Sequence, residues 1–234
     1  MKTRIDHLVV GALNLQHGVS YVKEVLGVVM PYGGMHVQMG THNHLMQLGK
    51  DVFLEVISID SDIDPPKAPR WYGLDDPFIK RQIKKRPVFL TWVVNTKNIN
   101  AFIQKASVSF GTPELISRGE LRWYFGVPDD GRLIAGGMLP YVIEWQIDRH
   151  PASNMADVGC RLKSLEIHHP LPFWIKSVLG SIDASDLVKV HALPKNEVPY
   201  LIANIDTPSG ERKLHSNVSL LNNSRKVTGL RPTP

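Results

Sequence analysis

Three apolar segments of this chain each carry one ionisable side chain, and these side chains are the first candidates for chemistry. They are His7, Glu55 and Glu144, within segments 5–10, 52–57 and 141–145. The β-branched and aromatic residues around them are typical of strands. Burying an ionised carboxylate without a partner costs on the order of several kcal/mol, so each glutamate must be paired, protonated or bound to a metal ion.

A purely structural interpretation of the same residues stays open. Each glutamate could form a buried ion pair with an arginine such as Arg118 or Arg122. His7 could be a core histidine that is hydrogen bonded to the backbone. In that case no metal need bind.

A second group of polar side chains lies between residues 36 and 44. His42 and His44 are two positions apart on a predicted strand, so they project from the same face and could chelate one ion. The alternative is that this segment lines a pocket. We therefore predict that His36, Asn43 and His44 are candidates for contact with a substrate.

Arg122 and Trp123 are adjacent in another predicted strand and complete the set of candidates. The arginine could hold a substrate carboxylate or phosphate, and the tryptophan could form a pocket wall. Large aromatic side chains in strands more often belong to the core, which is the competing interpretation.

Composition limits the class of protein. The chain has 234 residues, of which 43% are hydrophobic and 21% charged, as in soluble globular proteins with one large core or two smaller ones. Its apolar runs are only as long as strands, and its start has no signal-peptide core. We expect a cytoplasmic protein that does not enter membranes.

Cysteine and charge narrow the class further. Cys160 is the only cysteine, which excludes an internal disulfide and leaves His, Asp and Glu as metal ligands. The net charge is +5, but the basic residues are spread along the chain apart from a cluster at 80–86. That cluster is typical of an amphipathic helix with a basic face toward water, so nucleic acid is not predicted as a partner.

The order of predicted elements repeats along the chain. A strand, a helix that opens at Asn14 and closes at Gly27, and further strands up to Glu55 make one β-α-β-β-β unit. A second unit begins at residue 88 and ends with the Glu144 strand. His7 and Thr91 each precede the first apolar residue of the following helix by eight positions. This spacing makes Thr91 the counterpart of His7 and Glu144 the counterpart of Glu55.

The repeat predicts an α+β fold in which paired β-α-β-β-β modules form a cup-shaped mixed sheet, followed by a third, partial module. The predicted parts are a first module at 1–60, a linker with a basic helix at 61–87, a second module at 88–150, a partial β-α-β-β module at 157–221 and a loose tail at 222–234.

Several short motifs occur in a fixed order along the chain. They are Asp6-His7-Leu8-Val9-Val10, Gly34-Met35-His36, Gly40-Thr41-His42-Asn43-His44-Leu45, Phe53-Leu54-Glu55, Ser117-Arg118-Gly119 with Leu121-Arg122-Trp123, Leu139-Pro140-Tyr141-Val142-Ile143-Glu144-Trp145 and His168-His169-Pro170. With the two repeated units, they resemble the vicinal-oxygen-chelate superfamily, which includes glyoxalase I, extradiol dioxygenases, methylmalonyl-CoA epimerase and antibiotic-resistance proteins. Within it, the chain looks like bacterial proteins with a glyoxalase-like domain.

The resemblance implies a divalent metal ion inside the cup, with His7, Glu55 and Glu144 as its ligands. Thr91 occupies the fourth ligand position of the superfamily pattern, where a threonine is unusual. One imidazole and two carboxylates suit Zn, Mn, Fe or Ni. The resemblance further implies that the metal stabilises an enediolate-like charge on a small oxygen-rich substrate, with Glu55 or Glu144 as the base.

Three functions follow as hypotheses. The first is a metal-dependent enzyme of lyase, isomerase or hydrolase type. The second is a binding protein for an antibiotic-like small molecule, without catalysis. The third is an interaction protein that uses the basic helix at 80–86. Dimers are common in this superfamily, so a homodimer is open, although the third segment could cover the surface that a second subunit would use.

Overall fold

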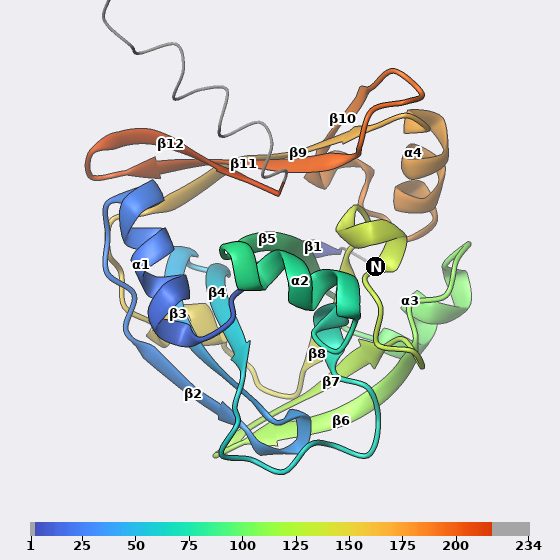
Figure 1. The fold of residues 1–234 in the computed structure, drawn as a ribbon. Helices are drawn as coiled ribbons and strands as arrows, with labels where there is room; N and C mark the ends of the chain where they lie inside the picture. Colours follow the sequence, from blue (N-terminus) through green and yellow to red (C-terminus); the bar gives the residue numbers. More distant parts are fainter. Residues whose placement is uncertain (1–2, 217–234) are drawn as a thin grey trace, which may run out of the picture.

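The computed structural model describes residues 3–216, and the tail expected at 222–234 lies outside this range. Its described part contains an eight-stranded sheet, a four-stranded sheet and four α-helices (Figure 1). The large sheet has the order β2-β3-β4-β1-β5-β8-β7-β6. Its strands are β1 (Arg4–Gly11), β2 (Tyr32–His36), β3 (Thr41–Gly49), β4 (Val52–Ile59), β5 (Val88–Asn95), β6 (Thr112–Arg118), β7 (Leu121–Val127) and β8 (Tyr141–Trp145).

The large sheet consists of two equivalent halves that meet along β1 and β5. β1 is parallel to β4, β5 is parallel to β8, and β1 and β5 pair antiparallel, with His7 opposite Val93. Each half has the same order along the chain, a strand, a helix and three strands. The prediction of paired modules forming a cup-shaped sheet is therefore confirmed.

The helix α1 (Leu15–Leu26) begins and ends where its sequence signals predict. The Asn14 side chain accepts a hydrogen bond from the His17 backbone N–H, and Gly27 ends the helix at a φ of 75°. Gly18 allows the helix to lie against the sheet, because a Cβ atom there would be 2.2 Å from Val56 Cγ1. The other helices are α2 (Pro77–Lys85), α3 (Ile99–Lys105) and α4 (Pro172–Ser181).

The two faces of the large sheet bury different cores, because successive side chains of a strand point to opposite faces. Leu8, Leu54 and Trp92 pack with the helices and the small sheet on the outer face. Val9 and Val93 belong to the apolar cluster of the inner face. The inner face of the cup is where His7 and Glu55 lie.

The segment predicted as a linker fills the cup. Most of the basic residues at 80–86 lie on α2, which opens at the Asp76 cap and buries Ile79 and Ile83. These residues pack with Trp71 and Tyr72 of the short 3-10 turn η2 (Trp71–Gly73) inside the curve of the large sheet (Figure 1). The segment between the modules therefore supplies part of the inner core.

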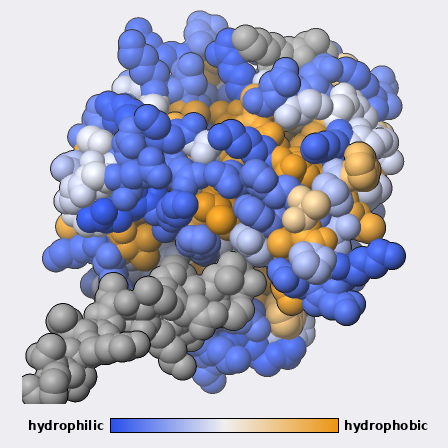
Figure 2. All heavy atoms as spheres, turned by 90° about the horizontal axis from the view of Figure 1, so that it is seen from above, coloured by the Kyte–Doolittle hydropathy of each residue, from blue (hydrophilic) through white to orange (hydrophobic). Residues whose placement is uncertain are grey.

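The C-terminal segment forms the small sheet, which lies above the large one in Figure 1 and packs on its outer core. Its strands are β9 (Arg161–His169), β10 (Lys189–Ala192), β11 (Tyr200–Thr207) and β12 (Gly210–His215), in the order β10-β9-β11-β12. Here the first strand is parallel to the second, whereas in each half of the large sheet it is parallel to the last. The surface seen from above is mainly hydrophilic, with apolar areas between (Figure 2).

Candidate active site

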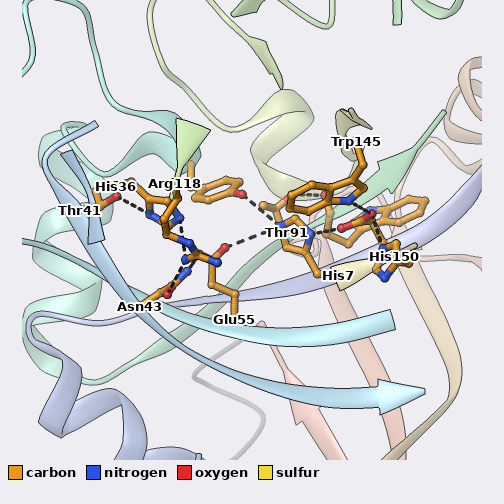
Figure 3. Close-up of polar contacts among 12 residues, drawn as sticks. His7, His36, Thr41, Asn43, Glu55, Thr91, Arg118, Trp145 and His150 are labelled. Atoms are coloured by element: carbon orange, nitrogen blue, oxygen red, sulfur yellow. Dashed lines mark hydrogen bonds and ion pairs between the residues drawn. The ribbon is translucent and has the colours of Figure 1, made fainter. Parts of the chain in front are cut away.

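A narrow cavity opens inside the cup, and side chains from both modules and from the segment between them line it. Its volume is about 30 Å³, which is room for roughly two water molecules at 10–15 Å³ each. The lining residues are His7, His36, Asn43, Leu45, Phe53, Glu55, Trp71, Tyr72, Arg118, Trp123, Phe125, Ile143, Trp145 and Met155. Figure 3 shows the polar members of this group.

His7 is buried at the centre of the site and is held on several sides. Its Nδ1 donates a 2.6 Å hydrogen bond to Asp6 Oδ1, so a neutral ring presents the lone pair of Nε2 to the cavity. Tyr72 donates to Nε2 at 3.2 Å, and Glu55 Oε2 lies 3.6 Å from the same atom. Phe53 stacks on the imidazole at 4.4 Å. The ring is therefore fixed with its basic nitrogen toward Glu55.

Asp6 is fully buried behind His7. Its Oδ2 accepts hydrogen bonds from His150 Nε2 at 2.8 Å, Trp145 Nε1 at 2.8 Å and Asn95 Nδ2 at 3.1 Å. Figure 3 shows Trp145 and His150 together beside His7. Burial alone would raise the pKa of Asp6, but the hydrogen bonds from His150 and His7 outweigh it and hold the pKa below its usual range. Asp6 is thus an ionised carboxylate at neutral pH.

A second chain of polar contacts leads away from Glu55. Asn43 Nδ2 donates to Glu55 Oε1 at 2.7 Å, and Asn43 Oδ1 accepts from Arg118 at 3.3 Å. Arg118 also lies 3.3 Å from His36 Nε2, and the other ring nitrogen of His36 lies 3.2 Å from Thr41 Oγ1. Asn43 therefore connects the carboxylate to the guanidinium and fixes both.

Burial shifts the pKa values of the two basic side chains in this series of contacts, His36 and Arg118. Burial, with the nearby Arg118 charge, lowers the pKa of His36 to about 3, so His36 is neutral and accepts a hydrogen bond from Arg118. Burial also lowers the pKa of Arg118, while Glu55 opposes that shift. The cavity thus contains one arginine cation near one glutamate.

Glu144 does not join His7 and Glu55, which corrects its predicted place among the metal ligands. Ile143 and Trp145 face the cavity, so Glu144 between them points to the other side of β8. There its carboxylate accepts hydrogen bonds from the Ile99 backbone N–H at 2.7 Å and from Gln146 at 2.9 Å. Glu144 stabilises the start of α3.

Strand register explains this difference. Glu55 is opposite Val9 on β1, and Tyr141 is opposite Val93 on β5. With Thr91 as the counterpart of His7, Val93 is the counterpart of Val9, so the counterpart of Glu55 is Tyr141. Thr91 itself donates its hydroxyl hydrogen bond to backbone carbonyl groups and offers no ligand to the cavity.

Only some of the residues predicted to contact a substrate line the cavity. His36, Asn43 and Trp123 line the cavity. His44 is on the opposite face of β3, where its Nδ1 donates to the Met30 carbonyl at 2.8 Å, and Arg122 is exposed outside the cavity.

Several important side chains were missed at the level of sequence. Asp6 lies at a register shift between Ile5 and His7, a bulge that changes the alternation of side chains along β1. His150, Tyr72 and Trp71 come from segments without a strand pattern. Arg118 was indicated by the sequence only as a possible ion-pair partner of a buried glutamate.

The side chains in the cup do not form the metal site predicted from His7, Glu55 and Glu144, because Glu144 lies outside the cavity. His7 and Glu55 could supply two ligands, with Asp6 orienting the imidazole as carboxylates do behind metal-bound histidines. Among residues 3–216, the group of three His or Glu ligand atoms within 4.8 Å of one another lies on the small sheet instead.

A cup built from two β-α-β-β-β modules is the fold of the vicinal-oxygen-chelate superfamily. Residues 5–177 match the model of the family described as "Glyoxalase-like domain", and the chain belongs to this family. The resemblance predicted from sequence is therefore confirmed. No curated protein matches the chain.

One solved structure with a TM-score above 0.5 shares the fold, and two others are similar to the chain more distantly. A hypothetical protein from Staphylococcus aureus is 13% identical with a TM-score of 0.57, and the match covers 92% of this chain and 85% of that one. Methylmalonyl-CoA epimerase from Mycobacterium tuberculosis is 16% identical, with a TM-score of 0.37 and coverage of 61% and 86%. A mutant 4-hydroxymandelate synthase from Streptomyces coelicolor is 11% identical, with a TM-score of 0.44 and coverage of 94% and 64%.

No helix within residues 3–216 is long and apolar enough to cross a membrane. Location in the cytoplasm and assembly into a homodimer stay predictions.

Proposed function

We propose that the cup is the active site of an enzyme that moves a proton at a carbon atom next to a carbonyl or carboxylate group of a small, oxygen-rich substrate. The reaction is of lyase, isomerase or hydrolase type. One observation carries the proposal: His7 Nε2 and Glu55 Oε2 lie 3.6 Å apart at a cavity that Arg118 also lines. A base, a second titratable group and a fixed cation are the parts that such proton transfer requires.

The pair of His7 and Glu55 is the proton-transferring unit. Asp6 orients the imidazole and stabilises its protonated form, so His7 can accept a proton and return it. Asn43 holds one oxygen of Glu55 and leaves the other facing His7. The proton removed from carbon is thus kept between two fixed groups.

Arg118 and Tyr72 are suited to the negative charge that develops on the substrate. The guanidinium can bind a substrate oxygen anion in a site with little water. Burial, with the nearby charge of Glu55, raises the pKa of Tyr72 well above its ordinary value. Its hydroxyl therefore keeps its proton and can donate it in a hydrogen bond to an enediolate-like oxygen.

The size of the cavity favours a small substrate over an antibiotic-like ligand. A drug-sized molecule needs a pocket of roughly 300–1,000 Å³, whereas this cavity has about 30 Å³. Glu55 is bound by Asn43 and faces His7, so it is not held in a simple arginine pair. Binding without chemistry stays the alternative.

A divalent ion of Zn, Mn, Fe or Ni on His7 and Glu55 is the metal-dependent form of this proposal. Water or substrate would have to supply its remaining ligands, because Glu144 and Thr91 point elsewhere. Elemental analysis of untagged protein tests this form, with a His7→Ala Glu55→Gln double variant for comparison. If the wild-type protein contains a metal ion that the double variant lacks, the ion would take the catalytic role that is assigned above to the protein groups.

The proposal predicts hydrogen–deuterium exchange at the acidic carbon of a substrate. Wild-type protein is incubated in D₂O with small 2-oxo acids and hydroxyketones, and loss of the proton signal is followed by NMR. Glu55→Gln should slow the exchange by on the order of 10²-fold or more. The matched control is Glu144→Gln, a glutamate on β8 that lies outside the cavity, and it should exchange at the wild-type rate.

Two results would reject the proposal. One is exchange that Glu55→Gln and His7→Ala leave unchanged. The other is tight binding of one of these compounds without any exchange, which would favour the binding-protein alternative.

A further inference from the structure

The outer face of the small sheet carries a second group of ionisable side chains, far from the cup. Glu166 and His168 are two positions apart on β9 and share a face, and His191 on β10 is the direct partner of His168. The opposite face of the same strands, with Leu165 and Ile167, belongs to the buried core. The three polar residues therefore lie together on a rigid support.

The distances between these groups match a metal centre. Glu166 Oε2 lies 3.6 Å from His168 Nε2 and 3.3 Å from His191 Nε2, and the three ligand atoms are within 4.8 Å of one another. Ligands bound to Zn²⁺ at 2.0–2.2 Å in a tetrahedron are about 3.4 Å apart. The spacing of the three ligand atoms is therefore already close to that of a metal centre.

The carboxylate is held in place by its neighbours. Asn204 Nδ2 donates to Glu166 Oε1 at 2.7 Å and also to Ser164 Oγ at 2.9 Å. One oxygen of Glu166 is thus occupied, and the other faces the two histidines.

His168 has a nitrogen without a hydrogen-bond partner. Its Nε2 is buried and is bonded to no group among residues 3–216. The ring is stacked between His191 at 4.6 Å and Tyr200 at 4.4 Å.

We propose that Glu166, His168 and His191 bind a divalent transition-metal ion, for which Zn²⁺ is the best match. Two imidazoles and one carboxylate are a common donor set for this ion, with water in the fourth position. The group is separate from His7 and Glu55, so the proposal does not depend on the chemistry of the cup.

Binding requires one side chain to turn. The rings of His168 and His191 are within 18° of parallel, so their Nε2 lone pairs cannot both point at one ion while the rings stay stacked. The His191 side chain is 44% exposed, whereas that of His168 is 18% exposed. His191 is therefore the ring that turns toward the ion, and the stack opens.

Calorimetric titration of Zn²⁺ into untagged, chelator-treated protein tests the site. We expect binding that His191→Ala and Glu166→Gln each weaken by about tenfold or more. His17→Ala, which removes an exposed histidine of α1, is the matched control and should bind as the wild type does. Glu55→Gln should also keep this binding, which separates the site from the cup.

A second readout separates loss of the ligand from loss of the fold. Far-ultraviolet circular dichroism and thermal melting of His191→Ala should match the wild type, because His191 is exposed on a short edge strand. In histidine NMR spectra, Zn²⁺ should shift the ring signals of His168 and His191. Absence of Zn²⁺ binding, or binding that a folded His191→Ala variant keeps in full, would overturn the proposal.

Discussion

His150 donates a 2.8 Å hydrogen bond to Asp6, although the two residues are 144 positions apart in the chain. The tautomer of the His150 ring is fixed by a second hydrogen bond. Because His150 Nδ1 accepts from the Ala152 backbone N–H, the ring proton of His150 must be on Nε2. His150 and Trp145, both bound to Asp6, line a larger cavity of about 280 Å³ on the far side. Asp6 thus lies between His7 and a more open part of the molecule.

Asp6→Asn should destabilise the fold by about 3 kcal/mol, because an amide can accept on one side only and would turn its NH₂ toward buried donors. Chemical denaturation measures the change. The matched control is Asp157→Asn, which alters an exposed pair with Arg161 and should have far less effect.

The same variant should change how stability depends on pH. The pKa of folded Asp6 lies below the unfolded value of 3.8, so its contribution is full above that pH and is lost as the pH falls toward the folded pKa. Wild-type protein should therefore lose stability below about pH 4 more steeply than Asp6→Asn does. Equal slopes for the two proteins between pH 4 and 2.5 would contradict the assignment.

His150→Ala should slow hydrogen–deuterium exchange at the acidic carbon of the substrate by about tenfold. The reason is that Asp6 loses one hydrogen-bond donor and holds His7 less firmly. His150→Gln should recover part of the rate, since the amide can donate to the same oxygen. Exchange rates by NMR at saturating substrate measure both. If the alanine variant exchanges as fast as the wild type, His150 has no positioning role.

The fold was predictable from sequence to the level of modules, since the repeated order of strand, helix and strands is a local pattern. The site was predictable only in part. His7 and Glu55 were found because each interrupts an apolar run, and the same signal at Glu144 was misleading, because a polar residue in a strand can face either side. Asp6 was hidden by a bulge, and Tyr72 and His150 reach the site only through tertiary packing.

Arg118→Met should raise KM for an anionic substrate by about tenfold or more, because the cavity loses its cation and Asn43 loses a donor. Arg122→Met is the matched control: it removes an exposed arginine four positions away and should leave KM unchanged. Initial rates of exchange against substrate concentration measure this. An equal rise in both variants would mean that only the overall positive charge matters.

Gly18→Ala should destabilise the protein by about 1–3 kcal/mol, although alanine is the better helix former. The new Cβ would meet Val56 Cγ1 at 2.2 Å, so α1 must move away from the sheet that carries Glu55. The matched control is Gly180→Ala in α4, where the nearest atom is Ser185 Oγ at 3.6 Å. That variant should gain about 0.4–1 kcal/mol. Urea denaturation of both compares them, and a stabilised Gly18→Ala would show that α1 can shift without cost.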